Sequence, residues 1–306
     1  MENNWVSYKN GNYIVALDTA HGTKIRYNDL DFFKADRPEN MDICITRYCE
    51  YGCPYCHENA TVNGKHGDIM NSKFIDTLPE WTEAAVGGGR VTSHPDLVPF
   101  LRKLKERHII ANITVQQTEF MSHLSLLREL SNQKLIYGLG ISLTNPYKEG
   151  FITAVKTFPN AVIHVINGVV TPAQLSALGC KDLKILILGY KEVRRGVAYK
   201  ANVDHMVEFR KNRLYASLPF IAEHNWFKTI SFDNLAIEQL EPKRFLSDEF
   251  YQEHYMGEDY DKMTSASFYV DLVENIFAPN SCDLNHRYNI ENRSATECLH
   301  FLQNQP

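Results

Sequence analysis

Three cysteines within eight residues are the part of the sequence best suited to chemistry. Cys49, Cys53 and Cys56 follow a short apolar alternating run, with three and then two residues between them. Three thiolates on one tight loop can each hold a different iron of a cubane cluster, and Gly52 and Pro54 allow the sharp turns between them. The fourth iron then lacks a protein ligand, and chemistry occurs at such open coordination positions.

The same cysteines allow a second interpretation, which is a zinc site or a purely structural cluster. A structural zinc ion normally takes four protein ligands, and His57 is the nearest candidate for the fourth. His57 follows Cys56 directly, which is poor geometry for binding the same ion. The chain also has no second pair of cysteines two residues apart, as a zinc ribbon requires. The spacing therefore favours iron and sulfide over zinc.

With Tyr55 as the aromatic residue before the last cysteine, the motif resembles the C-x3-C-x-aromatic-C signature of radical S-adenosylmethionine (SAM) enzymes. The resemblance extends more loosely over residues 41–190. It implies a 4Fe-4S cluster held by the three cysteines, SAM at the open iron, and adenine contacted by the backbone carbonyl of Tyr55. In that family an electron from the cluster cleaves SAM, and the 5′-deoxyadenosyl radical takes hydrogen from a substrate. An external reductant such as flavodoxin or ferredoxin is also implied.

Three glycines in a row follow the next predicted strand, and glycine lets a ligand approach the backbone closely. Radical SAM enzymes carry Gly-Gly-Glu-Pro here, often followed by a His-Pro pair, and His94-Pro95 stands at the matching spacing. The resemblance implies that Gly88 and Gly89 contact the cofactor. Arg90 replaces the acidic residue that receives the methionyl ammonium in the family, and a cation repels an ammonium.

The substitution at Arg90 leaves two alternatives open. In the first, backbone carbonyls hold the ammonium while Arg90 points away or meets the SAM carboxylate, and the protein is an active enzyme. In the second, the chain is a catalytically degenerate iron–sulfur binding or sensor protein.

Length and composition bound the function classes. The chain has 306 residues, 44% of them hydrophobic, and a formal net charge of −5 at pH 7, which suits one large barrel with an appendage. The longest basic run, Lys103 to His108, is no electrostatic sign of nucleic-acid binding. No apolar stretch approaches the ~20 residues that span a bilayer, and the N-terminus does not resemble a signal peptide. Seven cysteines, an odd number, favour a reducing, cytoplasmic location.

Strand and helix patterns alternate through the centre of the chain, which indicates parallel strands joined by right-handed crossovers. The predicted fold class is α/β, a partial (β/α)6 TIM-like barrel at residues 41–215. An N-terminal β-hairpin extension at 1–40, with its hairpin at 12–27, precedes it, and a C-terminal α+β extension at 216–306 follows. The predicted strands are 41–46, 84–86, 111–115, 135–144, 161–166 and 183–188, and the predicted helices include 72–80, 94–108, 121–130 and one that starts after Thr171.

In such barrels the active site lies at the C-terminal ends of the strands. Gln116, Ser142, Asn167 and Gly189 fall at those ends and are predicted to bind the cofactor. The fourth strand alternates large apolar residues with glycine or serine, so one of its faces is nearly bare and leaves room for a ligand. The alternative is a strand weakened by glycine that meets no ligand.

The C-terminal part offers weaker candidates. Asp233, Glu238, Tyr269 and Asp271 are possible members of a substrate rim, and a strand or hairpin is predicted from Met263 to Ile276. The two cysteines of this part are not clustered, so no second cluster is predicted. The sequence assigns neither the substrate nor the residues that act on it, because resemblance of fold does not choose among substrate classes.

Overall fold

The computed structural model describes residues 4–30, 32–255 and 265–305. Its main element is a sheet to which the chain returns from residue 40 to residue 289. The strands of this sheet are β4 (Asn40–Thr46), β5 (Glu83–Gly88), β6 (Ile110–Gln116), β7 (Gly138–Ser142), β8 (Ala161–Ile166), β9 (Lys184–Leu188), β10 (Thr229–Phe232), β11 (Ser267–Asp271), β12 (Ile276–Ala278) and β13 (Tyr288–Asn289).

The strands lie in the order β10-β9-β8-β7-β6-β5-β4-β11-β12-β13. From β10 to β11 all neighbours are parallel, and β12 and β13 continue the sheet in antiparallel fashion. The large parallel sheet with its intervening helices confirms the predicted α/β class. The pairings give an open strand order and do not confirm the predicted partial (β/α)6 barrel.

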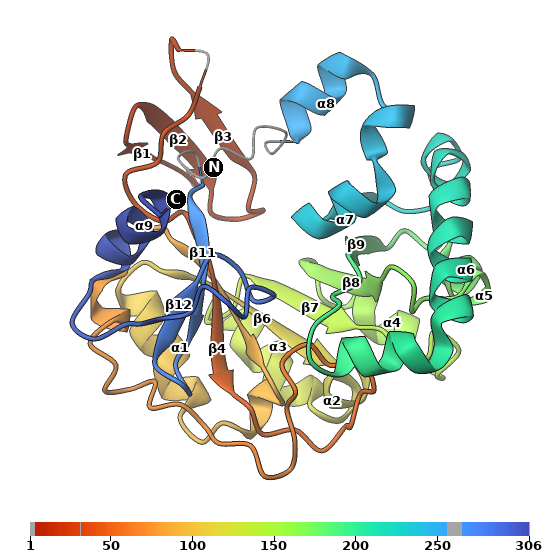
Figure 1. The fold of residues 1–306 in the computed structure, drawn as a ribbon, viewed down its shortest axis with the longest axis horizontal. Helices are drawn as coiled ribbons and strands as arrows, with labels where there is room; N and C mark the ends of the chain where they lie inside the picture. Colours follow the sequence, from red (N-terminus) through yellow and green to blue (C-terminus); the bar gives the residue numbers. More distant parts are fainter. Residues whose placement is uncertain (1–3, 31, 256–264, 306) are drawn as a thin grey trace.

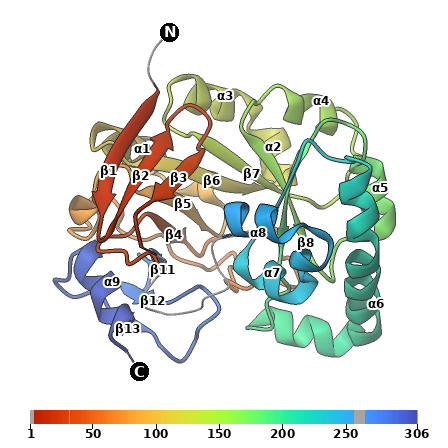
Figure 2. The same ribbon diagram turned by 90° about the horizontal axis from the view of Figure 1, so that it is seen from above.

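Helices connect the parallel strands: α1 (Leu97–Glu106), α2 (Gln117–Ser122), α3 (Leu124–Asn132), α4 (Phe151–Lys156), α5 (Pro172–Leu178), α6 (Arg195–Glu223), α7 (Asn234–Leu240), α8 (Asp248–His254) and, after the last strand, α9 (Ala295–Gln303). In Figure 1 the middle strands and helices α1 to α3 are drawn fainter and so lie at the back. Figure 2 shows α1 to α5 outside the sheet and α7 and α8 on its other side. Among the residues that the structure describes, no helix is long and apolar enough to cross a membrane.

The two faces of the sheet differ in exposure, because side chains alternate between them. The face toward the helices is apolar and buried, as at Ile43, Val86, Ile113, Ile141 and Ile163, each at most 1% exposed. The other face carries residues with water-accessible surface: Asp42, Ala85, Asn112, Thr114, Ser142 and His164. The sheet therefore has one packed face and one open face.

A separate three-stranded antiparallel sheet precedes the main one, formed by β1 (Trp5–Asn10), β2 (Tyr13–Asp18) and β3 (Lys24–Tyr27). It contains the predicted hairpin and one additional strand, β1. The buried carboxylate of Glu39, just before β4, pairs with Arg26 at 2.7 Å and with Lys24 at 3.5 Å. Lys24 also reaches Glu83 of β5 at 3.0 Å. These ion pairs attach the N-terminal sheet to the start of the main sheet.

Two helix predictions were wrong in extent. Residues 72–80 form only a short 3-10 helix, η1 (Ile75–Thr77), because Pro79 holds Leu78 in an extended conformation with ψ of 127°. The predicted helix 121–130 is two helices, α2 and α3, which meet at a non-helical residue, His123. Further short 3-10 helices lie at η2 (Val91–Ser93) and η3 (Pro242–Phe245).

The C-terminal part adds a strand next to the first strand of the core. β11 pairs in parallel with β4 and forms a hairpin with β12. The predicted strand or hairpin from Met263 to Ile276 is therefore present, although residues 263 and 264 lie outside the described ranges. This pairing brings Asp271 level with Cys44, directly below the cysteine loop.

Replacement of Phe100 by alanine tests the assigned core. Its side chain in α1 is 0% exposed, so Phe100→Ala is expected to lower the free energy of unfolding by about 3–5 kcal/mol. Phe209→Ala on α6, where the ring is 52% exposed, is the matched control and should change it by less than about 0.5 kcal/mol. Guanidinium denaturation measures both, and equal effects would contradict the assignment.

Candidate functional site

The cysteine loop begins where β4 ends, at the C-terminal edge of the parallel strands. The N–H of Cys49 donates to the carbonyl of Thr61 at 2.9 Å, and the N–H of Cys56 donates to the carbonyl of Cys53 at 3.2 Å. Gly52 has φ of +62°, a conformation that glycine adopts without strain. The loop is therefore a compact turn held by its own backbone and by the following segment.

The glycine segment at the end of β5, Gly87 to Gly89, packs against the backbone at the start of this loop. The N–H of Gly89 donates to the carbonyl of Thr46 at 2.6 Å, and that of Arg90 to the carbonyl of Tyr48 at 2.7 Å. A Cβ on Gly88 would lie 2.3 Å from the carbonyl oxygen of Thr46, and one on Gly89 would lie 2.2 Å from that of Tyr48. Glycine is required at both positions by backbone contact with the start of the cysteine loop.

A buried charge network, which we call the loop anchor (Arg47, Glu58 and Asp271), closes the cysteine loop. Arg47 lies two residues before the first cysteine and Glu58 two residues after the last. Their charged atoms are 3.1 Å apart, and the other guanidinium nitrogen of Arg47 pairs with Asp271 of β11. Arg194 also reaches Glu58, at 3.2 Å. The two ends of the loop are thereby joined to each other and to the sheet.

Glu58 is the acidic residue of the anchor with a clearly shifted pKa. Burial opposes ionisation of Glu58, yet the hydrogen bond with His57 and the cations of Arg47 and Arg194 lower its pKa to about 2. The hydroxyl of Tyr269 donates a further hydrogen bond to Glu58 at 3.1 Å. A buried ion pair whose remaining oxygens are hydrogen-bonded is hard to break, because loss of one partner leaves a bare charge.

Cys44, Glu58 and Asp271 bring three possible ligand atoms within 4.8 Å of one another, and within the described ranges this is the one such group. Arg47 pairs with both carboxylates and Arg194 pairs with Glu58 as well, so we assign the group to the anchor and not to a metal. Cys44 is 2% exposed and is a packed residue.

The donor set of the loop fits an iron–sulfur cluster. Cys49, Cys53 and Cys56 are free and partly exposed. Burial raises the pKa of Cys49 and of Cys53, and the nearby Cys56 raises both further. Thiols whose ionised forms repel one another gain most from bound metal, which replaces the protons and removes the repulsion. Ligand atoms that share a single ion tend to lie within 4.8 Å of one another, and the three sulfur atoms of the loop do not.

Arg90, which stands where the sequence resemblance predicts an acidic residue, is paired within the site. Its guanidinium forms an ion pair with Glu50 of the cysteine loop and lies 3.3 Å from Nε2 of His123. The ring of Tyr51 is 6.0 Å from the guanidinium carbon. The cation therefore joins the glycine segment to the cysteine loop and is neutralised there.

The remaining predicted cofactor residues lie at the same edge of the sheet. Tyr55 packs its ring edge-on against Tyr199, with centroids 5.6 Å apart. The side chain of Gln116 accepts from the N–H of Thr118 and caps α2, and Gln116 stands level with Ser142 across β6 and β7. These side chains have local structural partners or neighbours, and nothing in the contacts assigns them a ligand.

Helix α7 covers the ends of β8 and β9. Asn167 is 1% exposed, and its side-chain nitrogen donates to Gln239 at 3.0 Å. Its side-chain amide oxygen, Oδ1, is buried and unpartnered. The N–H of Gly189 donates to Asp233 at 2.8 Å, and a Cβ there would lie 2.4 Å from Leu235. Asn167 and Gly189 are thus brought together under α7.

Tyr269 and Asp271 were wrongly predicted as substrate-rim residues, because they are 2% and 0% exposed and belong to or contact the anchor. Asp233 caps α7 by accepting from the N–H of Ala236, and Glu238 is exposed on that helix. Sequence reasoning missed Arg47 and Glu58. The available signal was a pair of opposite charges that flank the cysteine motif symmetrically.

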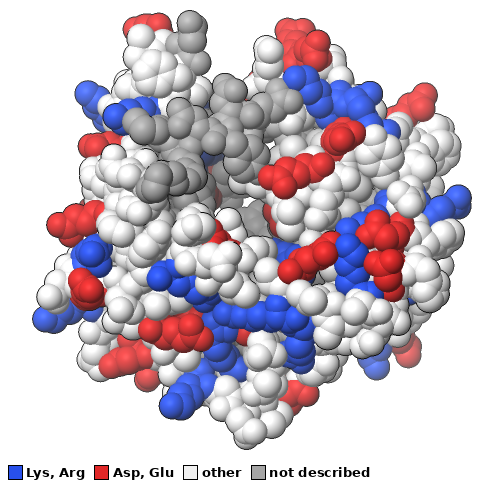
Figure 3. Space-filling view, in the orientation of Figure 1, with Lys and Arg blue, Asp and Glu red and all other residues white. Residues whose placement is uncertain are grey.

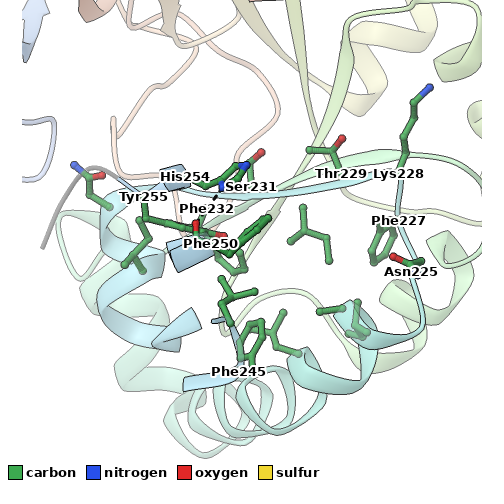
Figure 4. Close-up of a pocket in the computed structure, with 17 residues that line it drawn as sticks. Asn225, Phe227, Lys228, Thr229, Ser231, Phe232, Phe245, Phe250, His254 and Tyr255 are labelled. Atoms are coloured by element: carbon green, nitrogen blue, oxygen red, sulfur yellow. Dashed lines mark hydrogen bonds between the residues drawn. The ribbon is translucent and has the colours of Figure 1, made fainter. Parts of the chain in front are cut away.

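A hollow of about 650 Å³ lies between α6, β10, α7 and α8. Figure 4 shows aromatic side chains directed into it, among them Phe232, Phe245 and Phe250. None of the predicted site residues lines it. The candidate site is therefore the cysteine loop with the open face of the sheet beside it.

Comparison with solved structures relates this fold to SuiB from Streptococcus suis. SuiB bound to S-adenosylmethionine superposes with a TM-score of 0.60 at 12% identity, covering 100% of this chain and 88% of SuiB. SuiB bound to the precursor peptide SuiA gives a TM-score of 0.59 at 12% identity, with 99% and 88% covered. No protein-family model and no curated protein matches the sequence. The likeness shows a shared fold over nearly the whole chain.

Arg47→Met is expected to lower the free energy of unfolding by about 3–5 kcal/mol, because two buried carboxylates lose their cation. Arg293→Met is the control, since Arg293 is 33% exposed and its pair with Glu291 is worth less than about 1 kcal/mol. Urea denaturation of the metal-free protein measures both variants. A loss of similar size in the two would contradict the role of the anchor.

Proposed function

We propose that the protein is a radical SAM enzyme, whose 4Fe-4S cluster and SAM together produce a 5′-deoxyadenosyl radical that takes hydrogen from a substrate. The observation that carries the proposal is the cysteine loop: three free, half-buried thiols on one braced turn at the C-terminal edge of a parallel sheet. The shared fold with SuiB, which has been seen with SAM bound, supports it.

In this proposal Cys49, Cys53 and Cys56 hold the cluster, and the anchor keeps their loop closed over β4. Burial of Arg47 and Glu58 keeps water out of the base of the loop. We further propose that the parallel strands correspond to a partial (β/α)6 barrel, to which β10 and β11 of the C-terminal extension are added. The open face of the sheet is then the interior in which a reactive radical is shielded.

We propose that SAM lies along the C-terminal strand ends, against the backbone of Tyr55, Gly88 and Gly89. Gln116 and Ser142 continue this surface, while Asn167 and Gly189 lie buried beneath it under α7, where the side-chain oxygen of Asn167 still lacks a hydrogen bond. Because Arg90 is neutralised by Glu50, its charge opposes an ammonium less than a free cation would.

A zinc site is less well supported. His57, the candidate fourth ligand, directs Nε2 toward the carboxylate of Glu58 at 3.4 Å. The loop sulfurs are also spread more widely than the anchor atoms, which is the arrangement expected when each binds a different iron.

Reductive cleavage of SAM tests the proposal directly. Anaerobic reconstitution with iron and sulfide, followed by dithionite and SAM, is expected to give 5′-deoxyadenosine, measured by liquid chromatography. Cys53→Ala should abolish it, because the cluster loses a ligand, while Cys180→Ala, at an exposed cysteine, should leave it unchanged. If a preparation with a full complement of iron formed no 5′-deoxyadenosine, the proposed radical SAM activity would be refuted.

The second candidate, a cluster-bearing sensor without catalysis, is favoured only by Arg90. If Arg90 braces the loop through Glu50, Arg90→Gln and Glu50→Gln should weaken SAM binding alike, by up to about fivefold, since an ion pair of this exposure is worth about 1 kcal/mol at most. Anaerobic calorimetry measures this. Tighter binding in Arg90→Gln alone would indicate a degenerate site blocked by the cation.

A further inference from the structure

Two charged side chains near the open face of the sheet form no ion pair with the residues that the structure describes. Asp42, in the middle of β4, forms no hydrogen bond or ion pair with the residues that the structure describes. Lys191, just after β9, forms one hydrogen bond, from Nζ to the hydroxyl of Ser281 at 3.0 Å, and no ion pair in the same part of the chain.

Asp42 lies in a hollow and not on a convex surface. It is exposed to water, yet burial raises its pKa, which Lys191 and His57 oppose. Both observations hold for a carboxylate that water reaches while protein surrounds it. Its neighbour in register, Ala85, is also exposed, and a Cβ on Gly87 would meet no atom within 4 Å. Figure 3, seen from this side, shows the surface hollowed near its centre.

The segment after β9 reaches the β4 side of the sheet, because Lys191 contacts Ser281, just after β12, at 3.0 Å and Arg194 contacts Glu58 at 3.2 Å. Lys191 is close enough to oppose the pKa shift of Asp42, and the same cation opposes the rise that burial causes in the pKa of Cys282. No nitrogen–oxygen contact within 4.0 Å joins Lys191 to Asp42 or to Asp233, in the described part of the chain. The fold therefore holds an ammonium and a carboxylate apart across a space lined by small residues.

The geometry points to a binding site for a free α-amino acid, with its ammonium on Asp42 and its carboxylate on Lys191. A ligand that carries an ammonium and a carboxylate on one carbon atom satisfies both side chains at once, and charge-assisted hydrogen bonds of this kind are the strong ones. The small side chain of Ala85 and the bare Gly87 leave room for it. As the hollow adjoins the cysteine loop, the amino acid is the substrate of the proposed radical enzyme, and this role rests on the proposed function.

Ligand-observed NMR on the metal-free protein tests the binding site without the cluster. The probe is a mixture of the standard L-amino acids, each at millimolar concentration, and saturation transfer to at least one of them is expected. Asp42→Asn and Lys191→Met should each weaken its binding about tenfold or more, because each removes a hydrogen bond to a charged group. Glu149→Gln and Lys181→Met, at exposed positions, are the matched controls and should bind as the native chain does.

The outcomes separate this inference from the proposed function. No bound amino acid, or equal binding by all four variants, overturns the site. Full displacement of the amino acid by SAM also overturns it, because the hollow would then belong to the cofactor. A failure of 5′-deoxyadenosine formation in the native protein contradicts the enzyme without affecting the binding result.

Discussion

The ion pair between Arg47 and Glu58 is the interaction on which the site depends. Three thiols on a flexible loop would repel one another when ionised and would spread into solvent. Here the residues on either side of the motif are joined at 3.1 Å and tied to Asp271 of a strand that lies 224 residues further along the chain. Since these charges are buried, the loop cannot open without exposing an unpaired ion.

The sheet places this loop beside an open surface because its two faces are unequal. Isoleucine and valine fill the face against the helices, while glycine, alanine and short polar residues occupy the other. Gly88 and Gly89 then let the end of β5 approach the backbone below the cysteines. A reactive group held by the loop therefore stands at the rim of a surface with room for other molecules.

Local patterns predicted the parts of the fold that local physics decides. β8 was predicted at 161–166, and α5 begins where Thr171 and Pro172 indicated, because a capping hydroxyl and proline fix a helix start. The prediction of a helix at 72–80 was wrong for an equally local reason, since Pro79 holds Leu78 in an extended conformation. The pairing of β11 with β4 and the contact of Arg47 with Asp271 depend on distant segments, so no spacing in the sequence reveals them.

The central claim is that three cysteines leave one iron free to bind SAM. Electron paramagnetic resonance of the reduced, reconstituted protein, recorded before and after addition of SAM, tests it most directly. We predict the signal of a reduced 4Fe-4S cluster whose g-values shift when SAM is added, as a ligand binds the open iron. A bound zinc ion in place of iron, or a cluster signal that SAM leaves unchanged, would contradict the account.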